Sequence, residues 1–356
     1  MPAATMDSRF PPELLPMLQR DTMARLGLPA LPAMRVLKTF INPYSAVHVL
    51  EFNGLTGKQR LFVKQPKSPT RGHPKLQARL LAEFQIMDRV HDLRGDEGRF
   101  CVAKPIGVYP DYPAIATLDA GNKTLRSRYA NLARRWVPPR MRVDLLEQVQ
   151  QCGLWLRAFQ SRTSDGRGPF DTEGMIQYLL PRLQKLQAMK VLDVALAEGI
   201  VHTIRRLSQR HDAQDHPLVG RHNDFASHNI LAEGERVCII DFSMYDSGSF
   251  AHDPVNFWLE LELLKLDPTY DAVFLKGLQN TFLSAFGQIE TTHTAFVLAR
   301  CQYTVTRLLT TATRSSHWFP AFRHTRAATA ASLLWLQDFT GAAEATTPES
   351  RATASS

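Results

Sequence analysis

The first third of the chain alternates apolar and polar residues, whereas most of the remainder repeats its apolar residues with a helical period. Three runs at 35–41, 45–54 and 58–66 are rich in β-branched and aromatic residues and are separated by turn residues. The Asn53-Gly54 pair is the strongest hairpin signal among them. These runs predict an antiparallel sheet of roughly three strands in the N-terminal part of the chain.

A helical pattern follows over residues 75–93, where apolar residues recur without a helix breaker. Two more strands are expected around Val102 and at 114–118, after which the sequence is overwhelmingly helical to about residue 340. Strands and helices are thus segregated along the chain. This segregation is typical of an α+β fold with a small sheet lobe and a larger helical lobe.

Interruptions of these patterns divide the chain into four segments. The last residues are small and polar, a composition typical of a disordered tail. We therefore expect an N-terminal arm with a short helix at 1–34, a sheet lobe at 35–118, a helical lobe at 119–340 and a disordered tail at 341–356.

Composition narrows the class of protein. Lys and Arg outnumber Asp and Glu by 42 to 34, which gives a moderate formal charge of +8. The four cysteines lie far apart and form no CxxC pair, so neither a disulfide framework nor a zinc ribbon is indicated. No run approaches the roughly 18 apolar residues that a membrane span needs, and the first residues do not resemble a signal peptide. We expect a cytoplasmic protein.

The most informative segment, residues 218–258, is a short β-like stretch within the helical half. It predicts a hairpin that turns at 233–235 and carries Asp224, Asn229 and Asp241 at one end. Phosphoryl transfer from ATP uses such a set: one carboxylate orients the attacking hydroxyl, and a carboxamide and a second carboxylate hold Mg²⁺. Isolated Asp and Asn residues also cap turns. The pattern here is longer and more specific: His222-x-Asp224-x4-Asn229-Ile-Leu, then Ile240-Asp241-Phe242, Gly248 and Asp253-Pro254.

This pattern resembles the catalytic core of the aminoglycoside phosphotransferase and choline kinase family, small-molecule kinases related in fold to protein kinases. The resemblance implies a two-lobed protein-kinase-like fold and an ATP- and Mg²⁺-dependent phosphotransferase. It also implies roles for five residues: Asp224 matches the catalytic base, His222 the histidine that supports the catalytic loop, Asn229 and Asp241 the magnesium ligands, and Asp253 a structural acidic residue.

Two positions depart from the usual pattern of this family and its relatives. Asn223 stands where the family loop, H-G-D-x4-N, has glycine. Ser243 stands where kinases of the protein type have glycine after the metal ligand. Neither change removes a catalytic group, so activity is still expected.

The resemblance also implies a lysine on a strand paired with a glutamate on the next helix, where together they hold the ATP phosphates. Lys64 ends the run Leu61-Phe-Val-Lys, and Glu83 lies within the helical pattern that follows. Taken alone, each is more often a solvated surface charge. Their order and spacing around the catalytic pattern favour the ATP-binding interpretation.

Adenine is then expected near the junction of the two lobes, and the phosphates under the turn at 42–48. This turn contains no glycine, so Ser45 is the candidate that offers a hydroxyl and an amide in place of a glycine-rich loop. The residues expected to hold adenine through their backbone groups are Ile115, Ala116 and Leu118.

A basic cluster occupies residues 123–142, with one Lys, six Arg and no acidic residue. Leu125, Tyr129, Leu132 and Trp136 recur at helical spacing, which indicates an amphipathic helix. Such a helix suits peripheral contact with an anionic membrane or an anionic substrate. The alternative is a lobe-joining helix whose apolar face packs on the core. No recognition fold accompanies the charge, so we do not expect nucleic acid as a partner.

The charge of the chain narrows the chemical class of the acceptor but does not identify it. Aminoglycosides are polycations that suit an acidic pocket, and the basic cluster argues against them. We therefore expect ATP and Mg²⁺ as cofactors and a small-molecule hydroxyl acceptor, namely a carbohydrate such as a sugar or a cell-envelope glycan precursor. Two alternatives stay open: a pseudokinase or scaffold that binds nucleotide or a membrane surface without turnover, and a kinase of the aminoglycoside or choline type.

Overall fold

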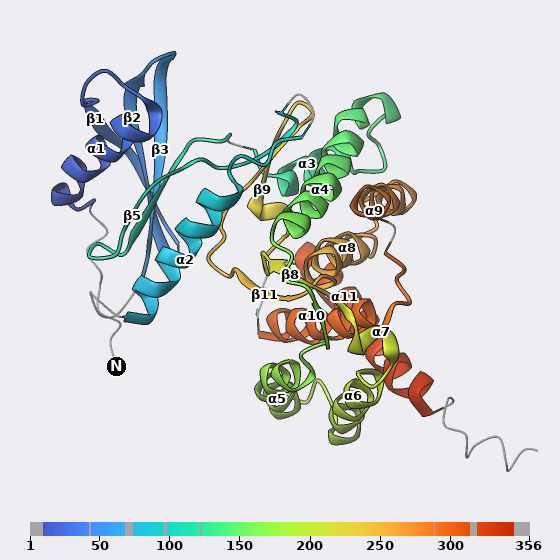
Figure 1. The fold of residues 1–356 in the computed structure, drawn as a ribbon. Helices are drawn as coiled ribbons and strands as arrows, with labels where there is room; N and C mark the ends of the chain where they lie inside the picture. The colour runs from blue at the N-terminus through green and yellow to red at the C-terminus, as the bar shows by residue number, and fades with distance from the viewer. Residues whose placement is uncertain are drawn as a thin grey trace, which may run out of the picture. The chain divides into compact units, whose positions relative to one another are not determined.

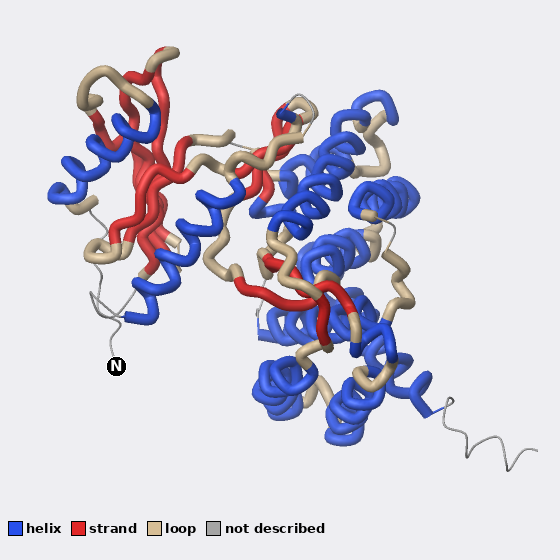
Figure 2. Tube along the Cα trace, in the orientation of Figure 1, coloured by secondary structure: helices blue, strands red, loops and turns tan. Residues whose placement is uncertain are grey.

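The structure, a computed structural model, describes residues 10–42, 44–67, 74–95, 98–121, 123–287, 289–313 and 319–344, with side chains in the last range given for 325–341. The chain forms two compact units. The first comprises the chain up to Ser127 together with Ser227–Tyr245, and the second comprises Arg128–Ala226 and the chain from Asp246 onward. Most strands belong to the first unit and most helices to the second (Figure 2).

The first unit is built on a five-stranded antiparallel sheet in the order β1-β2-β3-β6-β5: β1 (Met34–Ile41), β2 (Ser45–Gly54), β3 (Gly57–Pro66), β6 (Ala114–Leu118) and β5 (Pro105–Tyr109). β2 and β3 are joined by the turn Leu55-Thr56, directly after the predicted Asn53-Gly54 signal, and Gly57 leaves the turn with φ +109°. The sequence pattern does not predict β5, because Pro105 and a register shift before Gly107 interrupt its alternation.

Two helices, α1 (Leu15–Leu26) and α2 (Pro74–Val90), contact β5 (Figure 1). The side chains of Leu14 and Leu18 are fully buried in one apolar cluster with inward-facing residues of the sheet. The segment expected to be an irregular N-terminal arm is therefore packed into this unit from residue 10 onward, and residues 1–9 lie outside the described residues.

Successive side chains of a strand point to opposite faces of the sheet, so alternation determines which residues occupy the face opposite the α1 cluster. Leu61 and Val63 of β3 join the cluster that contains Leu14 and Leu18, whereas Phe62 and Lys64 point to the opposite face and line a cavity. Each strand in the centre of the sheet thus has one face in the core and one face available to a ligand.

A hairpin distant in sequence completes the first unit. It consists of β9 (Ile230–Glu233) and β10 (Arg236–Ile239), which turn at Gly234 with φ +55°, and the short helix η4 (Ser227–Asn229) precedes it. β10 pairs in parallel with β4 (Phe100–Val102). These hydrogen bonds explain why Ser227–Tyr245 groups with the sheet-rich unit, whereas the sequence boundaries assign the whole catalytic segment to the helical lobe.

The second unit is mainly helical. It also contains a small sheet in the order β11 (Asp246–Ser249), β8 (His216–Arg221) and β7 (Arg167–Gly168). Its helices are η3 (Pro139–Met141), α4 (Val143–Arg162), α5 (Thr172–Ala188), α6 (Val194–Leu207), α7 (His211–Gln214), α8 (His252–Leu264), α9 (Ala272–Phe286), α10 (Thr294–Thr313) and α11 (Phe319–Glu344).

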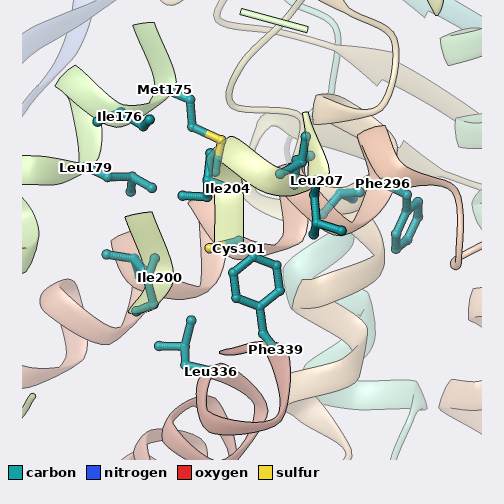
Figure 3. Packing of buried hydrophobic residues seen from close by; sticks show 14 of the residues in the cluster. Met175, Ile176, Leu179, Ile200, Ile204, Leu207, Phe296, Cys301, Leu336 and Phe339 are labelled. Carbon is teal, nitrogen blue, oxygen red and sulfur yellow. The ribbon is translucent and has the colours of Figure 1, made fainter. Parts of the chain in front are cut away.

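Buried apolar residues of α5, α6, α7, α8, α10 and α11 form most of the main core of this unit. Figure 3 shows Met175 of α5, Ile204 of α6, Cys301 of α10 and Phe339 of α11 within this cluster. α11 continues to Glu344, so the expected tail at 341–356 begins inside a helix, and residues 345–356 lie outside the described residues. Across the part of the chain that the structure describes, no helix is both long and apolar enough to span a membrane.

The basic cluster at 123–142 is not one amphipathic helix, which corrects the sequence-based expectation. α3 (Leu125–Leu132) ends before Trp136, because the chain then forms a bridge from Arg134 to Tyr270 and enters Pro138-Pro139. Leu125 and Tyr129 are buried in the core, as the alternative interpretation expects.

Several arginines of this cluster contact groups inside the protein. The Arg142 guanidinium is buried and lies 2.7 Å from Asp271 Oδ2. The Arg134 guanidinium lies over the Tyr270 ring, and Arg135 Nε donates a hydrogen bond to the Tyr270 carbonyl. Three of the six arginines are therefore engaged in contacts within the protein.

Candidate active site

A cavity of about 710 Å³ lies within the first unit, against the face of the sheet that is opposite the α1 cluster. Alternate residues of the central strands reach it: Val47 and Val49 of β2, and Phe62 and Lys64 of β3. Six residues predicted from the sequence to act in ATP or metal binding line this cavity: Ser45, Lys64, Glu83, Ile115, Leu118 and Asp241.

Lys64 is the charged centre of the cavity. Its Nζ donates a hydrogen bond of 2.5 Å to Asp241 Oδ1 and lies 3.9 Å from Glu83 Oε1. Burial raises the pKa of Glu83 to about 7, and the Asp241 charge adds to this rise, while Lys64 and Arg79 oppose it. The predicted lysine–glutamate pair is therefore formed, with the Glu83 side chain only 4% exposed.

Asp241 and Asn229 lie at the same end of the β9–β10 hairpin. Asn229 directly precedes β9, and its carbonyl accepts a hydrogen bond of 3.0 Å from the Ile240 amide. Asp241 has φ +66°, in the left-handed region that Asp tolerates better than most residues, and its Oδ1 accepts a hydrogen bond of 3.4 Å from the Ser243 amide. This backbone turn carries the Asp241 carboxylate into the cavity beside Lys64.

The donor set at this end of the hairpin fits Mg²⁺. Asn229 and Asp241 offer a carboxamide and a carboxylate oxygen, the hard ligands that Mg²⁺ prefers. Among the described residues, no group of three His, Cys, Asp or Glu side chains could hold a metal by itself. Such a sparse set suits Mg²⁺, which usually combines one or two protein ligands with phosphate and water.

The backbone role expected of Ile115, Ala116 and Leu118 requires correction. β6 lies between β3 and β5, so its backbone groups are already committed to two ladders, and the Leu118 amide donates to the Lys104 carbonyl. Ala116 also faces the α1 cluster, whereas the side chains of Ile115 and Leu118 face the cavity. The Asp119 amide still donates to the Arg60 carbonyl of β3, so the backbone leaves the ladder only after Asp119, at Ala120 and Gly121, which also line the cavity.

Ser45 begins β2 directly after the glycine-free turn. Its carbonyl accepts a hydrogen bond of 2.8 Å from the Asn42 amide, and both residues line the cavity. Ser45 is only 9% exposed, whereas Tyr44 of the same turn is 85% exposed. The turn thus presents Ser45 to the cavity, while Pro43 lies outside the described residues.

The predicted catalytic loop, residues 222–226, precedes the hairpin and belongs to the second unit. Asp253, at the start of α8, is fully buried and accepts hydrogen bonds from the backbone amides of His222 (2.7 Å) and Asn223 (2.8 Å). Burial raises the pKa of Asp253 to about 7, although these two amides and Arg221 oppose the rise. His222 is also fully buried, so the loop is held by backbone contacts inside the core.

The geometry of Asn223 explains one departure from the family pattern. Its φ is +61°, a conformation that glycine adopts freely and that asparagine tolerates. Asn223 Nδ2 donates a hydrogen bond of 2.6 Å to Asp246 Oδ1, and Arg221 forms a two-point ion pair with the same carboxylate at 2.7 and 2.8 Å. Asparagine therefore satisfies the backbone requirement and adds a side-chain contact.

Asp224 is partly exposed and is followed by the fully buried Phe225. The Phe225 ring stacks on Trp155 of α4 at 5.4 Å and contacts Phe257 of α8 at 5.6 Å. This aromatic packing fixes the backbone next to Asp224. In sequence the loop continues directly into Ser227, where the first unit resumes.

Sequence reasoning missed one residue beside the site, Arg79, and at least two residues that line the cavity, Phe62 and Asp119. Arg79 lies one helical turn before Glu83 on α2, and its Nη2 donates a hydrogen bond of 3.1 Å to the Ser243 carbonyl. The i, i+4 spacing from Glu83 is the signal that could have identified it. Strand alternation from Lys64 could have identified Phe62, and extending the strand beyond Leu118 could have identified Asp119.

Comparison with known proteins agrees with this arrangement. A model of the phosphotransferase enzyme family matches residues 51–289, which include Lys64, Glu83 and the whole catalytic pattern. None of the curated protein sequences matches the chain.

Three solved structures share the fold at 14% sequence identity. Glucosamine kinase (crystal form B) has a TM-score of 0.52 and covers 88% of this chain and 97% of its own. The streptomycin-ATP-APH(2")-IIa ternary complex has a TM-score of 0.51, with coverages of 90% and 96%. An aminoglycoside phosphotransferase from Alicyclobacillus acidocaldarius subsp. acidocaldarius DSM 446 has a TM-score of 0.50, with coverages of 96% and 97%.

The predicted α+β kinase-like fold is thereby confirmed. Since the family model spans well over half of the chain, the protein belongs to the phosphotransferase enzyme family, and it is a kinase-type transferase with a hydroxyl acceptor.

Proposed function

We propose that the protein transfers the γ-phosphoryl group of ATP, with Mg²⁺, to a hydroxyl of a small carbohydrate. The observation that carries the proposal is the contact of Lys64 with both Asp241 and Glu83 inside one cavity. A lysine, a buried glutamate and a metal-binding carboxylate are the charged groups that kinase-like phosphoryl transfer requires. The volume of about 710 Å³ is suited to a nucleotide-sized ligand.

The charged and apolar ends of the cavity indicate how the nucleotide is oriented in it. Lys64 supplies the positive charge for the phosphates, and Glu83 keeps the ammonium directed toward Asp241. The base then occupies the apolar part of the cavity, between Ile115 and Leu231. We propose that Ala120 and Gly121, rather than the paired strand β6, offer the backbone groups that recognise the base.

Asn229 and Asp241 are the residues that would hold Mg²⁺. When bound, the ion neutralises phosphate charge and polarises the phosphoryl group. Lys64 contributes a second positive charge beside Asp241, so the residues of this site can bind the phosphates and stabilise the charge that shifts to the leaving group.

Asp224 is the group we assign to the acceptor. As a partly exposed carboxylate on a loop fixed by Asp253 and Phe225, it can orient an acceptor hydroxyl and accept its proton. Positioning of this kind, together with charge stabilisation, supplies most of the catalysis in phosphoryl transfer.

A carbohydrate is the acceptor class we favour. The fold neighbours include a glucosamine kinase and a complex that contains streptomycin and ATP. The charge argument against polycations is weaker than the sequence implies, because Arg134, Arg135 and Arg142 contact groups within the protein.

The test is a phosphate-transfer assay with purified protein, ATP and Mg²⁺ against sugars, amino sugars, aminoglycosides and choline. We expect a phosphorylated carbohydrate, identified by mass spectrometry. Transfer to choline alone would contradict the carbohydrate class, and transfer to aminoglycosides alone would support the aminoglycoside-type alternative instead. Mg²⁺-dependent ATP binding without transfer to any compound, and without slow ATP hydrolysis, would support the scaffold alternative instead.

A further inference from the structure

Two of the four cysteines are direct neighbours across a pair of strands. Cys101 of β4 and Cys238 of β10 are register partners in the parallel pairing of these strands. Side chains of register partners project from the same face of a sheet. Neighbouring strands lie about 4.8 Å apart, which is within the Cα separation of about 4.4–6.8 Å that a disulfide spans. Both residues are free thiols in the structure.

The two thiols differ in their surroundings. Both line a second cavity of about 910 Å³ in the first unit, together with Arg94 and Arg236. Cys101 is partly exposed, whereas Cys238 is buried at 4% exposure. Contact with the Cys238 thiol, assisted by the charges of Arg236 and Arg94, lowers the pKa of Cys101 below its usual range, although burial opposes this change. The same contact and burial raise the pKa of Cys238.

We propose that Cys101 and Cys238 form a reversible dithiol–disulfide site that reacts with hydroperoxides, with Cys101 as the attacking thiol and Cys238 as the resolving thiol. Three observations favour this pairing. The two cysteines are register partners, a hydroperoxide can reach them from the second cavity, and the guanidinium groups of Arg94 and Arg236 line the same cavity. Across the described chain, no third metal-ligating side chain joins these two thiols, which argues against a metal site.

The chemistry proceeds in two balanced steps. The Cys101 thiolate attacks one oxygen of a hydroperoxide, the O–O bond breaks, and a sulfenic acid and an alkoxide or hydroxide ion form. The Cys238 thiol then attacks the Cys101 sulfur, forms the S–S bond and releases water. The peroxide is reduced by two electrons and the two thiols are oxidised to one disulfide. A dithiol reductant reverses the change.

The site is connected to the nucleotide cavity through both strands. The chain leaves β10 at Ile239 and continues into Ile240 and Asp241, and it leaves β4 at Val102 and continues into Ala103. Ile240, Asp241 and Ala103 all line that cavity. Although the Cα separation suits a disulfide, the Cβ atoms of register partners lie about as far apart as their strands, about 4.8 Å, and a disulfide brings them to about 3.8 Å. We therefore expect oxidation to shift Asp241 and weaken nucleotide binding, a consequence that rests on the proposed function.

The other two cysteines of the chain are internal controls for thiol reactivity. Cys152 and Cys301 are both fully buried, and burial raises the pKa of each thiol. Neither lines the second cavity. These residues should stay reduced and unalkylated in the native protein, so that any selective reaction at Cys101 is visible against them.

The experiment treats the full chain with hydrogen peroxide, blocks remaining thiols with an alkylating reagent and maps the cysteines by peptide mass spectrometry without reductant. We expect loss of two hydrogen atoms per chain, one crosslinked peptide pair containing Cys101 and Cys238, and complete reversal by dithiothreitol. Before oxidation, alkylation of Cys101 should be at least about tenfold faster than that of Cys152 or Cys301. In Cys238→Ser, the Cys101 sulfenic acid should accumulate and react with dimedone.

Three results would overturn the proposal: a disulfide that involves Cys152 or Cys301, a crosslink between two chains only, or equal alkylation of all four thiols. Nucleotide affinity is measured on the reduced and the oxidised protein. If oxidation leaves the affinity unchanged, the coupling to Asp241 is wrong. If the reduced protein binds no nucleotide, the proposed function fails, and the mapped disulfide still tests the thiol site.

Discussion

The carboxylate of Asp253 accepts a hydrogen bond of 2.7 Å from the backbone amide of His222, in a position where no part of Asp253 is exposed to solvent. Its second oxygen accepts the Asn223 amide at 2.8 Å. One buried side chain thus fixes the two residues that precede Asp224, although none of these contacts involves Asp224 itself. Packing of Asp253 in the core therefore determines the backbone conformation just before Asp224.

Asp253→Ala should lower the free energy of unfolding by about 2–5 kcal/mol, because it leaves two backbone amides without their acceptor. Asp253→Asn keeps one carboxamide oxygen and should lose less. Urea unfolding measures both. Asp338→Ala, an exposed helical position, is the matched control and should change stability by less than about 0.5 kcal/mol. A stability of Asp253→Ala equal to this control would refute the role of Asp253.

Glu83 predicts a pH dependence of nucleotide binding. Its pKa rises from an ordinary value of 4.5 to about 7, chiefly through burial. The negative charge that holds Lys64 is therefore present above about pH 7 and is lost as the pH falls. We expect the nucleotide affinity of the wild type to decrease below pH 7, measured by titration calorimetry between pH 6 and 8.

The control is Glu83→Gln, which has no charge to lose. The titration of the nucleotide phosphates is common to both proteins, so the difference between their profiles isolates Glu83. Parallel profiles would contradict the assignment. The pH dependence of folding stability has the opposite sign. Between pH 4.5 and about 7, Glu83 keeps a proton in the folded protein that it releases in the unfolded chain. The contribution of Glu83 to folding stability therefore falls as the pH rises through this range.

Lys64→Met should weaken nucleotide binding by roughly 10- to 100-fold, since a charge-assisted contact contributes about 1.5–3 kcal/mol. The substitution also leaves Asp241 and Glu83 near each other without their shared cation. Lys185→Met, at an exposed position in the last turn of α5, is the matched control. Equal affinities of the two variants, measured by fluorescence titration, would show that Lys64 does not contact the phosphates.

Two glycines give a test of helix packing that is independent of catalysis. A Cβ added at Gly153 of α4 would lie 2.5 Å from the Phe282 carbonyl of α9, whereas one at Gly277 of α9 has no atom within 4 Å. Gly153→Ala should destabilise the protein by roughly 1–3 kcal/mol through overpacking. Gly277→Ala should stabilise it by about 0.5–1 kcal/mol. Unfolding midpoints shifted in the same direction would contradict this difference.

The sequence predicts the fold and the charged residues well, for physical reasons. Lys64, Glu83 and Asp241 are polar residues with fixed spacing from strands and helices, and strand alternation determines which face they occupy. The position of Asn223 needs a positive φ, which the family pattern expresses as glycine and this chain meets with asparagine. Such local requirements are visible in the order of residues.

Tertiary pairing could not be predicted in the same way. The commitment of Ile115 and Ala116 to two ladders depends on β5, whose strand pattern Pro105 interrupts. The placement of the β9–β10 hairpin beside β4 depends on hydrogen bonds between segments more than a hundred residues apart. The end of α3 at Leu132 depends on contacts with Tyr270. These features arise from partners that periodicity does not identify.

The most direct test of the account is phosphate transfer by Asp224→Ala from γ-labelled ATP to the acceptor found in the panel. We expect turnover to fall by at least about 100-fold, because the group that orients the hydroxyl is gone, while ATP affinity stays at the wild-type value. Asp338→Ala, treated identically, should retain full turnover. Wild-type turnover in Asp224→Ala would contradict the assignment of Asp224 and with it the proposed mechanism.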